Sequence, residues 1–261
     1  TFENVLNLCN RLGISISEQD KILAATDYFL SKTEKDRQHT CAPVEVVNSR
    51  VSALISSEAA KVADILNKNR DLFHYAHRRN KEVVSTIESQ ARDEKVAKEC
   101  ARIAKNAKTL KRADIENLEL GVKGGFSLSD EQIAAIKLAS SNAISIVTGG
   151  PGAGKTTMVQ GLVGALKARG KKIKLCAPTG RAAKRIAETP GLSSYKPSTI
   201  HMFLIRQSSR QEEYDYMIVD ESSMIDIGLM LELLSAIPNG TNIIFIGDAD
   251  QLPPVGPGQV F

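Results

Sequence analysis

A glycine-rich string ending in a lysine and a threonine stands at residues 148–156, Thr-Gly-Gly-Pro-Gly-Ala-Gly-Lys-Thr. It directly follows the apolar, strand-like run Ala143–Val147. The spacing of Gly149, four residues, Gly154, Lys155 and Thr156 is that of a phosphate-binding loop. In such a loop, backbone amides and the next helix N-terminus form a cradle for an anion, because glycines let the backbone approach it.

The side chains that close this string suit a nucleoside triphosphate with Mg²⁺. Lys155 can reach the β- and γ-phosphates, and the Thr156 hydroxyl can take a position on the metal ion. A chance match is the alternative, but the strand before the loop and the apolar run Met158–Leu166 after it argue against chance. The sequence therefore predicts an ATP site with Mg²⁺ whose cradle comprises Gly150, Gly152, Ala153, Gly154, Lys155, Thr156 and Thr157.

Two carboxylates follow a second apolar run, in Met217-Ile218-Val219-Asp220-Glu221. Asp220 can hold Mg²⁺, directly or through water, and Glu221 can act as general base on an attacking water. A plain pair of surface carboxylates at a strand end is the alternative. The phosphate loop upstream favours the catalytic interpretation, because an ATPase needs both parts.

A third string, Gly247-Asp248-Ala249-Asp250-Gln251, also follows an apolar run. Carboxyl ends of parallel strands lie along one edge of a sheet, so Gln251 could meet the γ-phosphate and report its presence. Residues rich in Asp, Gly and Pro also form turns without any such role. That alternative explains a loop but not this particular string.

Two further segments could hold a phosphodiester chain. The first is Ala177–Arg185, with Pro178, Thr179, Arg181 and Lys184, and the second is Ser198–His201, with Thr199 and His201. Hydroxyls, backbone amides and cations suit phosphate contacts. The cations could equally form a solvated helix start, and His201 could be a structural hydrogen-bonding residue. Spacing alone leaves these alternatives open.

Gln132 has two interpretations of equal standing from its local sequence. Its amide has both a donor and an acceptor, so it could read the adenine edge. Ser129-x-x-Gln132 is also a capping box, in which Gln132 satisfies a helix N-terminus.

Composition narrows the class of protein. The chain has 261 residues, of which 42% are hydrophobic and 25% charged, as in globular domains. No apolar run approaches the length needed to cross a membrane, and no secretory-type N-terminus is present. The four scattered cysteines indicate free thiols in a reducing, cytoplasmic setting rather than disulfides or a zinc site. A net charge of +4 supports nucleic-acid binding only weakly.

The pattern of apolar residues changes near residue 120. Residues 1–120 show helical spacing throughout, including a long helix expected over 88–111 whose basic row comprises Lys95, Lys98, Arg102 and Lys105. That row could face nucleic acid, although a solvated helix face is the commoner meaning. Gly121–Gly125 is the best linker candidate. Beyond it, strands expected at 143–147, 172–176, 216–219 and 242–246 alternate with helices, which predicts an α/β fold with a parallel sheet.

Taken in order, these strings resemble the RecD family of superfamily 1 DNA helicases. The strings that carry the resemblance are residues 149–157, 177–185, 199–201, 219–226 and 247–258. Residues 12–43 and 88–110 more loosely resemble the N-terminal region of the stand-alone RecD-like helicases. The resemblance implies an all-α accessory domain over 1–120, comprising the end of a helix-hairpin-helix region and a winged-helix-like bundle. It also implies a RecA-like P-loop motor domain over 121–261.

The same resemblance assigns roles to positions. It implies Gln132 for adenine, Lys155 and Thr156 for phosphate and Mg²⁺, Asp220 and Glu221 for Mg²⁺ and water, and Gln251 for the γ-phosphate. It places Pro178, Thr179, Thr199 and His201 near single-stranded DNA, and Arg181 and Lys184 are candidates beside them. It implies movement in the 5′-to-3′ direction and duplex unwinding in DNA repair or recombination.

The resemblance also sets limits. The chain begins at Thr1 and ends at Phe261, before the family's second motor domain with its arginine fingers. We therefore expect a fragment that binds Mg·ATP and hydrolyses it slowly, with single-stranded DNA and duplex junctions as partners and no membrane. Partner subunits stay unknown. The rival hypothesis is a nucleotide-dependent DNA-binding or scaffold module without helicase activity.

Overall fold

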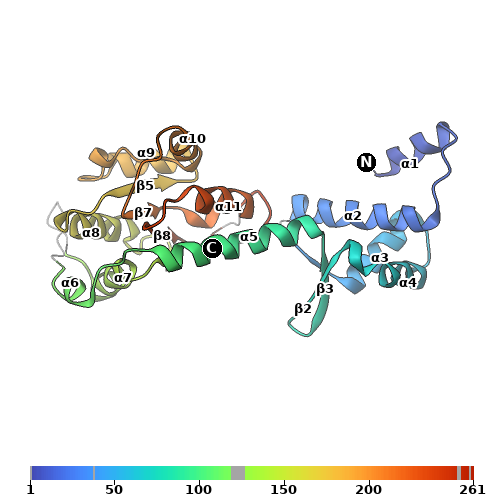
Figure 1. The fold of residues 1–261 in the computed structure, drawn as a ribbon, viewed down its shortest axis with the longest axis horizontal. Coiled ribbons are helices and arrows are strands. Elements are labelled where there is room, and N and C mark those ends of the chain that lie inside the picture. The colour runs from blue at the N-terminus through green and yellow to red at the C-terminus, as the bar shows by residue number, and fades with distance from the viewer. Residues whose placement is uncertain (1, 38, 119–126, 252–253, 259) are drawn as a thin grey trace. The chain divides into compact units, whose positions relative to one another are not determined.

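The computed structural model describes residues 2–37, 39–118, 127–251, 254–258 and 260–261 (Figure 1). The chain forms two compact units whose division in sequence falls between Glu94 and Lys95, within helix α5 (Ile87–Asn106). The candidate linker Gly121–Gly125 lies outside the described residues. No helix in the described ranges is long and apolar enough to cross a membrane.

The first unit is mainly helical, as its residue spacing predicts. Its helices are α1 (Phe2–Arg11), α2 (Glu18–Arg37), α3 (Val44–Ile55) and α4 (Ala59–Lys68). Pro43 is the N-cap residue of α3. Val47 and Val51 of α3 are fully buried, whereas Val46 and Leu54 are more than a third exposed. This helix therefore buries only part of its apolar face.

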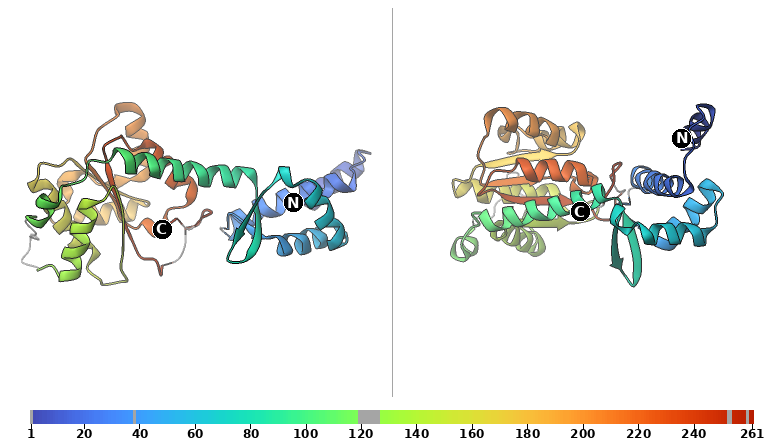
Figure 2. Two further views of the ribbon diagram at one scale, coloured as in Figure 1. Left: turned by 60° about the horizontal axis from the view of Figure 1, so that its bottom comes forward. Right: turned by 45° about the vertical axis from the view of Figure 1, so that its right-hand side comes forward.

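The expectation of an all-α accessory region omits a small antiparallel sheet. Strands β1 (Ala42–Pro43), β3 (Lys81–Ser85) and β2 (His74–Arg78) pair in that order. The β2–β3 hairpin extends from the helices of this unit (Figure 2). Its turn residues Arg79 and Asn80 have φ of 48° and 61°, a left-handed turn usually marked by glycine. Without glycine, and with a strand rich in polar residues, the hairpin signal is weak in the sequence.

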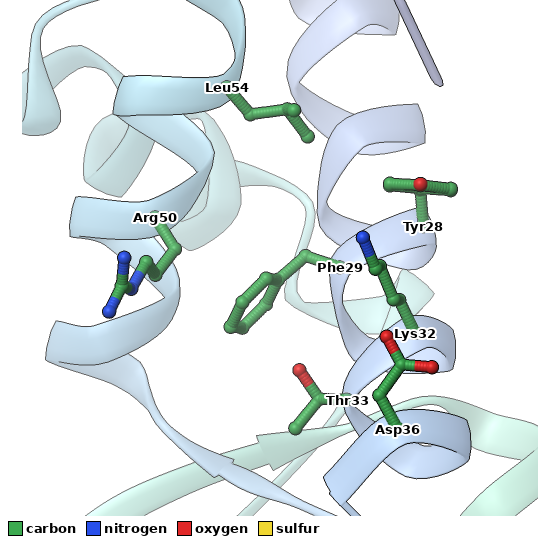
Figure 3. A pocket seen from close by; sticks show the side chains of 7 residues that line it. All are labelled: Tyr28, Phe29, Lys32, Thr33, Asp36, Arg50 and Leu54. Atoms are coloured by element: carbon green, nitrogen blue, oxygen red, sulfur yellow. The ribbon is translucent and has the colours of Figure 1, made fainter. Parts of the chain in front are cut away.

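A cavity of about 430 Å³ opens between α2 and α3 of the first unit (Figure 3). Phe29 of α2 points towards α3, and the Lys32 ammonium lies 5.9 Å from the centroid of the Tyr28 ring. The lining residues are Tyr28, Phe29, Lys32, Thr33, Asp36, Arg50 and Leu54.

The second unit contains a five-stranded parallel sheet in the order β4-β8-β7-β5-β6, which confirms the predicted α/β fold. Four strands lie within one residue of the predicted ones: β4 (Ile144–Thr148), β5 (Ile173–Ala177), β7 (Tyr216–Val219) and β8 (Asn242–Gly247). The two-residue strand β6 (Ser198–Thr199) is too short for a period to be visible in the sequence.

Alternate residues of the central strands face two separate cores. In β7, Tyr216 and Ile218 belong to one core and Met217 and Val219 to the other, as the two-residue period of a strand requires. The first core also contains residues of α7 (Asp130–Ser141), α8 (Lys155–Ala168) and α9 (Gly180–Glu188). The second contains residues of α5, α10 (Ile200–Arg210) and α11 (Ile227–Ala236). Helices therefore cover both faces of the sheet (Figure 1).

The segment before the candidate linker packs with the second unit. Ile103 of α5 lies in one core of the sheet, and Leu110 and Leu118, which flank α6 (Arg112–Glu116), lie in the other. The division between units thus comes earlier than residues 120 and 121, where the sequence predicts it, because the apolar stripe of the long helix is buried against the sheet.

Candidate functional site

The predicted site residues follow the carboxyl ends of the parallel strands. The phosphate loop follows β4, Asp248 follows β8, Asp220 follows β7, Pro178 follows β5 and Thr199 ends β6. Because all five strands are parallel, these ends share one edge of the sheet. Strand β8 lies between the phosphate-loop strand and the strand that carries Asp220.

The phosphate loop has the backbone that an anion cradle needs. Gly152 and Gly154 have φ of 78° and 74°, in the left-handed region, and Gly154 precedes the first turn of α8. The left-handed φ favours glycine at Gly154, and a Cβ there would also displace the flexible end of the Gln132 side chain. The free amides of the first α8 turn point towards the loop side of the helix.

Gln132 caps its own helix and also contacts the phosphate loop. Its side-chain Oε1 accepts from the backbone amide of Ser129 at 3.0 Å. Its backbone amide donates to the Ser129 hydroxyl at 3.3 Å, which completes the capping box. Its Nε2 donates to the Gly154 carbonyl at 3.2 Å. The capping alternative is therefore correct, and adenine recognition by the same amide stays a prediction.

Lys155 lies folded over the loop from which it starts. Its ammonium donates to the carbonyls of Gly149 and Gly150, the latter at 3.0 Å. Thr156 is exposed on the first turn of α8, and Thr157 is half-buried. The lysine and the threonine hydroxyl thus lie on the cradle, where phosphate and Mg²⁺ contacts are predicted.

The two carboxylates after β7 are held rigidly. Asp220 is buried, its amide donates to the Cys176 carbonyl at 3.0 Å, and its Oδ1 accepts from the Glu221 amide at 2.9 Å. Burial raises the pKa of the Asp220 carboxyl, and the Glu221 amide and Arg185 oppose that rise. Glu221 has a φ of 55°, a left-handed conformation that is strained for a side chain of this length.

Arg185 of α9 forms an ion pair with both of these carboxylates. Its Nη2 donates to Glu221 Oε1 at 2.6 Å and to Asp220 Oδ2 at 3.2 Å. The sequence interpretation grouped Arg185 with the cations for DNA phosphates, but the structure places its guanidinium on the predicted catalytic pair. No local spacing reveals this contact, because it depends on the pairing of β5 with β7, which brings α9 beside the end of β7.

Gln251 lies in the loop after β8. Its Nε2 donates to Asp248 Oδ2 at 3.3 Å, and its amide donates to the Asp248 carbonyl at 3.2 Å. The same loop is tied to the phosphate-loop strand, since the Ala249 amide donates to the Thr148 hydroxyl at 3.3 Å. The structure therefore connects the two loops, while contact of Gln251 with a γ-phosphate stays a prediction.

The predicted DNA residues divide into helix caps and exposed cations. Thr179 caps α9 by accepting from the Ala182 amide, and Thr199 caps α10 by accepting from the Met202 amide, both at 3.2 Å. These hydroxyls therefore have a structural role at the least. The remaining residues of this group are half-buried Pro178 and exposed Arg181, Lys184 and His201.

A groove of about 650 Å³ brings several of these predictions together. It joins the cations of α9 to the residues predicted for water activation and phosphate sensing. Its lining residues are Thr179, Arg181, Ala182, Lys184, Arg185, Glu188, Glu221, Met224 and Gln251. Pro178, Thr199 and His201 are not among them.

The residues present fit a magnesium nucleotide. Glu221 Oε2 is buried and has no hydrogen-bond partner among the described residues, as suits a carboxylate that acts on a small polar molecule. The described residues contain no group of three or more His, Cys, Asp or Glu that could hold a metal by themselves. Thr156 and Asp220 would supply the one or two oxygen ligands typical of Mg²⁺ that is also bound by phosphates.

Comparisons with known proteins agree with this geometry. Residues 132–257 match the model of the AAA domain family. The ATP-dependent RecD2 DNA helicase of Deinococcus radiodurans is 39% identical over 143 residues, which are 52% of this chain and 20% of that protein. The RecBCD enzyme subunit RecD of Mycobacterium tuberculosis is 32% identical over 189 residues, 62% of this chain and 32% of that protein.

The crystal structure of Bacteroides Pif1 bound to ssDNA matches 49% of this chain and 34% of that one, at 24% identity and a TM-score of 0.36. The chain spans between 20% and 32% of the length of the two curated relatives. The phosphate loop, the carboxylates after β7 and the loop after β8 all fall within the region matched by the family model. Over that region the chain matches the AAA domain family and is similar in sequence to RecD-type helicases.

Proposed function

We propose that this chain is the first motor domain, with part of an accessory region, of an ATP-dependent DNA helicase. The reaction is ATP hydrolysis coupled to 5′-to-3′ movement along single-stranded DNA and to separation of duplex at junctions. The observation that supports it most is the groove that is lined both by exposed cations of α9 and by Glu221 and Gln251. DNA contacts and hydrolytic residues in one groove are what coupling requires.

Each residue has a task within this proposal. The phosphate-loop amides and Lys155 hold the phosphates, while Thr156 and Asp220 hold Mg²⁺. Mg²⁺, when bound, would neutralise charge on the phosphates. Glu221 takes the proton from the attacking water through its unpartnered Oε2, and Gln251 senses the γ-phosphate. Contacts with single-stranded DNA are assigned to Pro178, Thr179, Arg181, Lys184, Thr199 and His201.

The names of the relatives support the choice of substrate. Those proteins are described as an ATP-dependent DNA helicase and as the RecD subunit of the RecBCD enzyme. We assign residues 1–120 to the accessory region and 121–261 to the motor domain from the family resemblance of the sequence, with Ile103, Leu110 and Leu118 of the accessory region packed in the cores of the motor's sheet. The proposed process is DNA repair or recombination.

Two substitutions in the complete protein test the proposal. Lys155→Ala should abolish ATP-driven strand displacement and leave nucleotide-free DNA binding largely intact, because Lys155 lies on the phosphate loop. Glu221→Gln should lower ATP turnover by a factor of roughly 10² to 10⁴, the usual contribution of a general base. Arg112→Gln, which breaks only an exposed pair with Glu116, is the matched control. Strand displacement that survives Lys155→Ala in a folded protein would refute the helicase assignment.

A further inference from the structure

Arg185 is the only described hydrogen-bond partner of the Glu221 carboxylate. One carboxylate oxygen accepts from the guanidinium, and the other is buried without a partner. Asp220 differs, because its Oδ1 also accepts from the Glu221 amide. Among the described residues, Arg185 alone therefore fixes the orientation of the Glu221 carboxylate, the predicted general base, and determines which of its oxygens stays free.

The arginine itself is far less enclosed than the carboxylates it contacts. Its side chain is 54% exposed, against 10% for Asp220 and 14% for Glu221. It also lines the groove, together with Arg181 and Lys184 of the same helix. A guanidinium has five N–H donors, and only Nη2 donates to a carboxylate here. Arg185 is thus accessible to an anion that enters the groove.

The charges of the groove favour such an anion. Arg181 has no ion-pair partner among the described residues, and Lys184 pairs only with exposed Glu188, at 3.7 Å. Salt bridges of this exposed type contribute little and yield easily to a stronger anion. A phosphodiester backbone, which carries a charge at every nucleotide, would therefore be attracted to the turn of α9 that carries Arg185.

We propose that Arg185 is a positioning residue that couples occupancy of the groove by single-stranded DNA to the action of Glu221. Without DNA, the guanidinium holds Glu221 Oε1 and keeps the carboxylate in the orientation in which Oε2 is buried, away from an attacking water. With DNA, the phosphates compete for the guanidinium, and Glu221 is released to act as general base. This inference rests on the proposed function, since it gives Glu221 the role of general base.

The test measures steady-state ATP hydrolysis by the complete protein with and without a single-stranded oligonucleotide. The variants are Arg185→Gln, Arg185→Lys and the control Arg112→Gln. For Arg185→Gln we expect the DNA-free kcat to rise at least about threefold, a small part of the 10² to 10⁴ that a general base contributes. The ratio of DNA-stimulated to DNA-free kcat should fall correspondingly, with the KM for ATP unchanged.

Arg185→Lys keeps a cation but not the planar guanidinium, so it should recover part of the stimulation ratio. The control should match the unmodified protein in both kcat values. A DNA-free kcat that falls in Arg185→Gln, or a stimulation ratio that stays at the unmodified value, overturns the coupling role. If the unmodified protein shows no stimulation by DNA, the proposed function fails. If DNA stimulates it and Arg185→Gln leaves the stimulation ratio unchanged, only this inference fails.

Discussion

Cys176 shows how strongly a single position in the sheet changes the chemistry of its side chain. It lies in β5, fully buried, with its Sγ 4.0 Å from the Ser198 hydroxyl. Burial raises the pKa of its thiol to about 11, because the thiolate would lose its hydration. The other three cysteines are partly exposed. The free thiols predicted from the sequence are therefore not equivalent.

We predict that iodoacetamide at pH 8 alkylates Cys9 and Cys41 in the native protein and leaves Cys176 unmodified. The thiolate is the reactive form, and a pKa near 11 leaves only about one thiol in a thousand ionised at that pH. Raising the pH towards 11 should increase the thiolate fraction about tenfold per unit. Peptide mapping by mass spectrometry measures the modification, with the urea-unfolded chain as control. Equal labelling of Cys9 and Cys176 before unfolding would contradict the prediction.

At the scale of elements, Arg102 shows that a basic row can be partly structural. Its Nη2 donates to the carbonyls of Leu234 at 2.7 Å and Ile237 at 3.0 Å, at the C-terminal end of α11. Its Nη1 donates to Asn239 Oδ1 at 2.7 Å. A cation at this end of a helix adds donors to carbonyls near the helix terminus, here those of Leu234, which also accepts from the Ile237 amide, and Ile237. For Arg102, the alternative of a DNA-facing residue is therefore disfavoured.

We predict that Arg102→Ala lowers the free energy of unfolding by about 2 kcal/mol, because three hydrogen bonds from a charged donor to the end of α11 and to Asn239 are lost. Lys105→Ala is the matched control, since Lys105 is exposed in the same helix and should change stability by less than about 0.5 kcal/mol. Urea denaturation followed by circular dichroism measures both. Equal stabilities of the two variants would show that Arg102 does not stabilise the C-terminal end of α11.

The elements that the sequence predicts correctly are those with a strong period or a specific string. Strands β7 and β8 are predicted clearly because four apolar residues follow one another in each, and the glycine string marks the loop after β4. The β2–β3 hairpin was missed because Arg79 and Asn80 turn without glycine. The contact of Arg185 with Glu221 was missed because it depends on strand order, which local spacing does not contain.

At the scale of the whole molecule, charge decides where nucleic acid binds. The net charge of +4 is too small to act as a general attraction, so local clusters of cations must provide it. Two clusters compete for this role: Arg181 with Lys184 beside the groove, and the basic row of α5. Since Arg102 has a structural role, the comparison of the two clusters requires Lys95 and Lys105, which are exposed, to represent the row.

We predict that Arg181→Ala/Lys184→Ala weakens binding of a single-stranded oligonucleotide at low salt by roughly three- to tenfold, and that Lys95→Ala/Lys105→Ala changes it little. Loss of two phosphate contacts should also reduce the slope of log K against log salt by about 1 to 1.5. The loss should be similar for unrelated oligonucleotide sequences, since phosphate contacts carry no base information. Fluorescence anisotropy over a salt series measures both effects. The reverse ranking would move the DNA site to the row on α5.

The left-handed backbone conformation of Glu221 implies a trade-off between the stability of the folded protein and its predicted activity. The conformation and the unpartnered buried oxygen both disfavour the folded state, by about 1 kcal/mol or more in total. Asparagine adopts this conformation readily and has no charge to bury. Glu221→Asn should therefore raise the melting temperature by a few degrees, as calorimetry would measure, while ATP turnover is lost. Selection for thermal stability alone would replace Glu221 with asparagine. The presence of the glutamate therefore reflects selection for ATP turnover.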